Sequence, residues 1–163
     1  MNHEAVFILL LAGVYIGIML AWKRFRMHQL KRWWTAGQEA LVSGDAAAAV
    51  SAFRKCVRIW PATPNFHEAL GTALSHAGKL DEAEKELRLT VALEPSRAQS
   101  HLDMALFYAF AAPGRDREAL DAFARVRELD PALAEEALKK EQIAARLDEA
   151  DRRCGAAAPD AAG

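Results

Sequence analysis

The sequence predicts an all-α protein made of stacked pairs of helices, and three observations lead to this prediction. Three prolines recur at intervals of 34 and 36 residues: Pro61, Pro95 and Pro131. A glycine lies 17 residues before each of them: Gly44, Gly78 and Gly114. Between glycine and proline, apolar residues recur at spacings of four, as in Ala83, Leu87 and Val91, which places them on one helical face. Two-helix repeats of this length cannot bury their apolar faces alone, so they are expected to stack into a solenoid.

The N-terminal segment is strongly apolar. Residues 5–22 read AVFILLLAGVYIGIMLAW and carry no charge. As a helix they rise about 27 Å, close to the hydrocarbon thickness of a bilayer. Positive charge follows this run instead of preceding it, which favours an uncleaved anchor over a cleaved signal peptide. We therefore expect residues 1–22 to form a transmembrane anchor.

A basic neck, residues 23–32, follows the expected anchor. Its cations are Lys23, Arg24, Arg26, Lys31 and Arg32. By the positive-inside rule they predict a single-pass membrane protein with its N-terminus outside and its repeats in the cytoplasm. The Ala- and Arg-rich composition indicates a bacterial source, and hence the inner membrane. The neck either only sets this topology or also binds anionic lipid, to which Lys and Arg are attracted.

Each repeat is expected to contain two helices, because glycine ends a helix in the left-handed conformation and proline cannot continue one. The predicted helices cover residues 29–43 and 45–60 in repeat one (30–61), 65–77 and 80–93 in repeat two (64–95), and 99–111 and 116–129 in repeat three (98–131). The turn of repeat three is two residues longer than that of repeat two. No proline precedes residue 43, so a helix continuous with the anchor is an open alternative. A final amphipathic helix over residues 132–152 is expected to cap the solenoid, before a disordered tail over 153–163.

Charge and motifs exclude several classes of function. The net charge is −1, with +4 over residues 1–34 and −5 over the remainder, and an acidic repeat region argues against nucleic-acid binding. The chain contains neither a CxxC pair nor a nucleotide-binding or hydrolase motif. His67 and His101 are one repeat apart, too far to share a metal whose ligands lie at about 2 Å. The sequence therefore indicates neither an enzyme nor a cofactor, metal or small-molecule site.

Residues 30–131 resemble tetratricopeptide repeats. The matches in repeat two are Leu70, Gly71, Leu74, Ala83, Leu87 and Pro95. Those in repeat one are Trp33, Gly37, Ala49, Phe53 and Pro61, and those in repeat three are Met104, Ala105, Tyr108, Ala119, Phe123 and Pro131. His67 and His101 depart from the pattern, because they replace a large apolar residue. The resemblance implies a right-handed α-α superhelix with a concave groove that binds proteins.

The resemblance also implies which residues line that groove. They are Trp34, Gln38, Leu41 and Val42 in repeat one; Asn65, Glu68, Thr72, Ser75 and His76 in repeat two; and Gln99, Leu102, Leu106 and Phe110 in repeat three. Some family members clamp a C-terminal carboxylate with Asn and Lys or Arg, but the corresponding positions here hold Gln38, Thr72 and Leu106. Acidic chaperone tails are therefore not the expected ligands. The C-terminal helix or a second copy of the chain could instead cover the apolar ends of this groove.

Together these features favour a membrane-anchored adaptor that binds protein partners through its groove and assists assembly or regulation of a membrane-associated complex. The expected partners are membrane-associated proteins and lipid, with no nucleic acid and no small-molecule substrate. One alternative is a permanent subunit of a large membrane complex, since Gly13 and Gly17 form a close-packing GxxxG motif. Another is a periplasmic factor for cytochrome or pilus assembly, which requires the opposite orientation.

Overall fold

The computed structural model describes residues 3–156, with side chains for residues 7, 8 and 10–155. Its regular elements are α1 (His3–Val42), α2 (Ala46–Ile59), α3 (Pro64–His76), α4 (Leu80–Leu93), α5 (Ala98–Leu106), η1 (Phe107–Ala111), α6 (Asp116–Leu129), α7 (Pro131–Leu138) and α8 (Glu141–Ala156). All of them are helical, and η1 is a π-helical turn. Residues 1–2 of the expected anchor and 157–163 of the expected tail lie outside the described residues.

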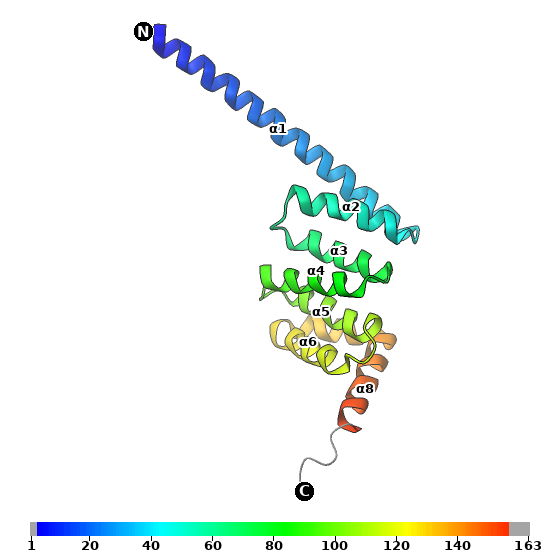
Figure 1. Ribbon diagram of the computed structural model, residues 1–163. Coiled ribbons are helices and arrows are strands. Elements are labelled where there is room, and N and C mark those ends of the chain that lie inside the picture. The colour runs from blue at the N-terminus through cyan, green and yellow to red at the C-terminus, as the bar shows by residue number, and fades with distance from the viewer. Residues whose placement is uncertain (1–2, 157–163) are drawn as a thin grey trace.

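The helices pack as antiparallel pairs that stack in a row (Figure 1). The pairs are α1 with α2, α3 with α4, and α5 with α6, as the prediction of an all-α solenoid required. One apolar cluster joins these pairs around Phe53 and Leu74, which are almost fully buried. A second cluster joins Phe123 and Val126 of α6 to α7 and α8. The solenoid is therefore held by apolar contacts between neighbouring helices.

The turns inside repeats one and two require glycine. Gly44 and Gly78 have φ of 79° and 71°. This left-handed conformation is energetically unfavourable for any residue that has a Cβ atom. Each turn satisfies the last helical carbonyls in the same way. Asp45 N–H donates to Ala40 O at 2.8 Å, and Lys79 N–H donates to Leu74 O at 2.9 Å. The glycine spacing therefore encodes the reversal between the paired helices.

The capping segment differs from its prediction as a single helix. It forms two helices, α7 and α8, separated by Lys139 and Lys140. Asp130 starts α7 by accepting a hydrogen bond from Leu133 N–H at 3.0 Å, with Pro131 in the first turn. The break lets both helices bury apolar side chains against the second cluster, among them Ala134 and Leu147. One straight helix could not follow the end of the solenoid in this way.

The predicted membrane anchor and single-pass localisation are contradicted. No helix among the described residues is long and apolar enough to cross a membrane. The expected orientation, with an external N-terminus, loses its basis together with the anchor.

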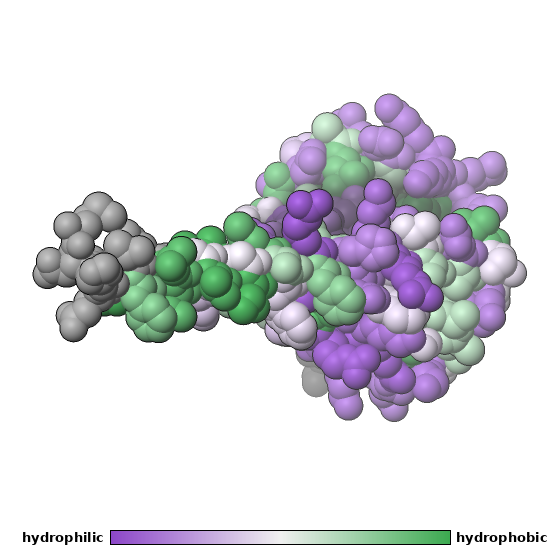
Figure 2. All heavy atoms as spheres, turned by 90° about the horizontal axis from the view of Figure 1, so that it is seen from above, coloured by the Kyte–Doolittle hydropathy of each residue, from purple (hydrophilic) through white to green (hydrophobic). Residues whose placement is uncertain are grey.

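α1 is one continuous helix that packs only at its C-terminal end. Its last turns lie against α2, while the N-terminal part projects away from the solenoid (Figure 1). Many large apolar side chains of the projecting part are exposed, including Leu10 (65%) and Tyr15 (65%). Figure 2 shows it as a mainly hydrophobic projection from a largely hydrophilic body. The alternative of one helix running from the N-terminal segment into repeat one is confirmed.

Candidate functional site

A cavity of about 800 Å³ opens between α3, the α5–η1 segment and the start of α8. Its lining residues are Thr72, Ser75, His76, Leu87, Asp103, Leu106, Phe107, Phe110, Ala111, Lys140, Glu141, Gln142 and Ile143. The first helices of repeats two and three form two of its walls, and the N-terminal end of α8 forms the third. We call this cavity the groove.

Five of the residues predicted to line a groove lie here together: Thr72, Ser75, His76, Leu106 and Phe110. Phe110 is 54% exposed, which is unusual for an aromatic side chain in a folded domain. The sequence did not single out Asp103 or the wall formed by residues 140–143. Whether any of these residues binds a partner remains a prediction.

The other predicted groove residues lie elsewhere. Trp34 packs on Phe53 and Phe66, with ring centroids 5.4 and 5.5 Å apart. Leu102 is only 6% exposed and belongs to the second apolar cluster, so its side chain is not accessible to a partner. The helical turn there faces α6 instead of the groove.

The remaining predicted residues do not line the groove. They are Gln38, Leu41, Val42, Asn65, Glu68 and Gln99. Glu68 forms an ion pair with Arg97, whose Nη2 lies 2.9 Å from Glu68 Oε2. Leu41 packs against the first cluster, whereas Val42 is 91% exposed at the end of α1. The residues of α1 therefore do not form one surface with those of α3 and α5.

The π-helical turn η1 explains the position of Phe110. Repeat three contains two residues more than repeat two between its helices, and η1 accommodates part of this insertion within the helix. Ala112 N–H donates to Phe107 O at 3.1 Å, the five-residue spacing of a π-helix. Such turns interrupt the regular helical phase and frequently occur at functional sites. The turn buries Phe107 and leaves Phe110 exposed in the groove.

Arg146 fixes the third wall of the groove to this turn. Its Nε donates to Ala109 O at 2.6 Å, and its Nη2 donates to Asp116 Oδ1 at 2.8 Å. Both Arg146 and Asp116 are largely buried, so these charge-assisted bonds are stronger than those on an open surface. A single side chain therefore joins α8 to η1 and to the first turn of α6.

Asp103 is the carboxylate on the α5 side of the groove. Its Oδ1 accepts a hydrogen bond from Gln99 Nε2 at 2.8 Å, and its Oδ2 is buried without a hydrogen-bond partner among the described residues. Burial, the negative charge of Glu68 and a hydrogen bond between the two carboxyl groups raise the pKa of the Asp103 carboxyl to about 7, against the opposing effects of Gln99 and Arg97. The groove therefore contains a carboxyl group whose negative charge is only partly balanced by hydrogen bonds and cations of the protein.

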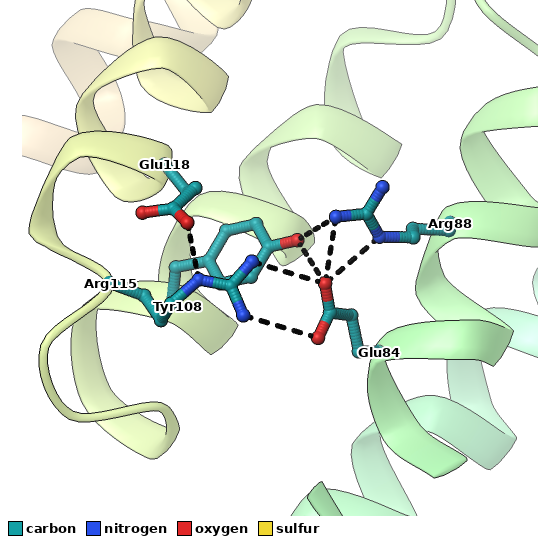
Figure 3. Close-up of polar contacts among 5 residues, drawn as sticks. All are labelled: Glu84, Arg88, Tyr108, Arg115 and Glu118. Atoms are coloured by element: carbon teal, nitrogen blue, oxygen red, sulfur yellow. Dashed lines mark hydrogen bonds and ion pairs between the residues drawn. The ribbon is translucent and has the colours of Figure 1, made fainter. Parts of the chain in front are cut away.

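A polar network on another surface joins repeats two and three (Figure 3). Tyr108 Oη donates to Glu84 Oε1 at 2.8 Å, and Arg88 Nε donates to the same oxygen at 2.9 Å. Arg115 also contacts Glu84, at 3.3 Å, and pairs with Glu118. Burial acts to raise the pKa of Glu84, but hydrogen bonds from Tyr108, Arg88 and Arg115 outweigh it and lower the pKa. Each of the five side chains pairs with at least one other member of the network, which indicates a structural role.

The cations of the basic neck do not form one surface. Arg26 donates to Ile59 O and lies 5.1 Å from the ring centroid of Trp60. Arg32 lies over Trp33, at 5.3 Å. Arg26 therefore joins α1 to the end of α2, whereas the contact of Arg32 lies within α1. Lys23, Arg24 and Lys31 are exposed. Nothing in this arrangement supports the predicted lipid binding.

Comparison with known proteins identifies the fold. No family model matches the chain. Among solved structures, the first TPR of Spaghetti (RPAP3) bound to the HSP90 peptide SRMEEVD gives a TM-score of 0.65 at 19% identity, covering 78% of this chain and 94% of that one. The chain has the tetratricopeptide-repeat fold. The Sgt2 TPR domain from Aspergillus fumigatus gives a TM-score of 0.64 at 18% identity, covering 82% and 91%.

Three further comparisons concern one solved peptide complex and two proteins that are similar in sequence. The Yersinia enterocolitica type III secretion chaperone SycD, in complex with a peptide of the translocator YopD, gives a TM-score of 0.65 at 15% identity, covering 76% of this chain and 93% of that one. Small glutamine-rich tetratricopeptide repeat-containing protein 2 of Mycosarcoma maydis is 31% identical over 117 residues, and its counterpart in Saccharomyces cerevisiae is 25% identical over 112. These matches cover 71% and 68% of this chain but 31% of each relative. The chain thus spans about a third of the length of these relatives.

Proposed function

We propose that this chain is a non-enzymatic adaptor whose groove binds a segment of a protein partner. The observation that carries the proposal is the exposed ring of Phe110 in a cavity of about 800 Å³. Concave cavities with apolar walls and a few polar groups are the usual sites of ligand recognition. Exposed apolar surface in such a cavity loses contact with water when a partner segment binds, which stabilises the complex.

The comparisons support a peptide segment as the ligand. Two of the similar folds are solved with a peptide, namely Spaghetti (RPAP3) with an HSP90 peptide and SycD with a YopD peptide. The cavity of about 800 Å³ is large enough to hold a few side chains of such a segment. A short helix or an extended strand would both satisfy this geometry.

Phe110→Asp tests the proposal. The full chain carrying an affinity tag is used to capture partners from an extract of its source, alongside the Phe110→Asp variant and a control, Phe25→Asp, whose exposed ring lies on α1. We expect Phe110→Asp to abolish partner capture while circular dichroism shows unchanged helicity, and Phe25→Asp to leave groove-dependent partners in place. Unchanged capture by Phe110→Asp would reject the groove as the binding site, and loss of helicity would show that Phe110 belongs to the core.

A second candidate function rests on the apolar surface of α1. Large exposed apolar patches commonly mark surfaces that are covered in an assembly, and Leu10, Tyr15 and Trp22 are each more than half exposed. In this alternative the chain is a permanent subunit of a larger complex. Its signature would be partners in fixed stoichiometry that remain bound to Phe110→Asp.

A further inference from the structure

The walls of the groove combine apolar contact with an excess of negative charge. Its apolar lining includes Leu106, Phe110 and Ile143. Among the described lining residues, the carboxylates are Asp103 and Glu141, and the only fully cationic side chain is Lys140. Lys140 is exposed and is followed directly by Glu141, whereas Asp103 lies deeper, between α3 and α5.

The surroundings of Asp103 leave its charge only partly balanced. The charged and titratable groups around it are Glu68 and His76 from α3, Arg97 before α5, and Lys140 and Glu141 at the start of α8. Arg97 is already paired with Glu68 at 2.9 Å. Gln99 donates one neutral hydrogen bond to Oδ1, and Oδ2 has no donor when both Asp103 and the neighbouring Glu68 are ionised. A buried carboxylate in this condition gains free energy from any cation that reaches it.

We propose that the groove selects a partner segment in which one Lys or Arg lies among apolar residues, with this cation next to Asp103 and the apolar residues against Phe110 and Leu106. The proposal rests on the proposed function and adds the chemistry of the ligand. Charge complementarity supports it, because an acidic segment would face Asp103 and Glu141 without the Lys or Arg clamp that an anion requires. Oδ2 is buried, so a cationic segment would complete its hydrogen bonding once the Asp103 side chain turns toward the cavity.

The test uses fluorescence anisotropy with the full chain at pH 8, above the pKa of Asp103. Three labelled amphipathic peptides of about 16 residues, rich in Leu, Ala and Gln, differ only in one central residue, which is Arg, Gln or Glu. We expect the Arg peptide to bind about tenfold more tightly than the Gln peptide, and the Glu peptide more weakly than either.

Two variants assign this preference to Asp103. Asp103→Asn should reduce the ratio between the Arg and Gln peptides to less than about twofold. The matched control Asp121→Asn removes an exposed carboxylate of α6 outside the groove and should leave the ratio intact. A preference that survives Asp103→Asn would overturn the proposal.

The remaining outcomes separate this proposal from the proposed function. Equal affinity for all three peptides, abolished by Phe110→Asp, would overturn the charge preference and retain the groove as a binding site. Failure of every peptide to bind, or binding that Phe110→Asp does not affect, would reject both. Sedimentation of the protein alone as an oligomer that Phe110→Asp dissociates would identify a second copy as the occupant and also overturn the proposal.

Discussion

Replacing Asp103 by Asn should change how the stability of the protein depends on pH. The pKa of Asp103 is about 7 in the folded protein and 3.8 in the reference state. Between these two pH values the folded state keeps a proton that the unfolded state has lost. The free energy of unfolding therefore falls as pH rises through this window, at a limiting slope of about 1.4 kcal/mol per pH unit.

The size of this effect follows from the same window. The full shift would correspond to about 4 kcal/mol, but solvent reaches part of the groove, so we expect about 1–2 kcal/mol. Asn cannot ionise and does not carry this penalty. The free energy of unfolding of Asp103→Asn should therefore exceed that of the wild type by about 1–2 kcal/mol more at pH 8 than at pH 5.

Urea titrations followed by circular dichroism at pH 5, 6, 7 and 8 would measure this difference. Titration of distant groups cancels when the variant is compared with the wild type at each pH, so the difference reports Asp103 together with the neighbouring Glu68. The control Asp121→Asn should give a difference that does not change with pH. A constant difference for Asp103→Asn, or one that decreases as pH rises, would refute the reasoning.

Two further predictions concern packing. Ala83 is fully buried between α3 and α4, so Ala83→Trp should destabilise the protein by about 3 kcal/mol or more through overpacking, whereas Ala92→Trp on the exposed face of α4 should change the urea midpoint little. Arg146→Met should cost about 2–3 kcal/mol, because Ala109 O and the buried carboxylate of α6 lose their donor. Hydrogen exchange should then increase in α8, and peptide affinity should fall; Arg152→Met, which removes an exposed side chain of the same helix, serves as control. Unchanged protection of α8 would show that apolar contacts alone hold this wall.

The repeats could be predicted because their signals are local. Gly78 must adopt positive φ at the turn, and proline cannot continue a helix, so the spacing of these residues predicts the helix ends without knowledge of tertiary contacts. The predicted start of α2 is confirmed for the same reason, since Asp45 accepts a hydrogen bond from Ala48 N–H at 2.9 Å. The apolar spacing of α4 likewise predicts its buried face.

The groove was predicted less completely. Family positions indicated Leu102 as a lining residue, but the contacts between α5 and α6 bury it. The same positions do not include Asp103, which lines the groove from α5, or residues 140–143, which reach the groove through the packing of α8. The inserted residues of repeat three were recognised as a longer turn, but the sequence did not indicate that part of them forms a π-helical turn, in which the carbonyl of Ala109 accepts a hydrogen bond from Arg146.

The sequence by itself determined the helical repeats of this protein, because glycine, proline and apolar spacing act through the backbone and through nearest neighbours. Tertiary structure decided which of the expected side chains face the groove and which others join them. It buried Leu102, exposed Phe110, and left the charge of Asp103 without a full set of hydrogen-bond donors. These outcomes depend on contacts between residues up to 37 positions apart, such as Arg146 with Ala109, and on the free energy of burying charge, which a linear pattern does not report.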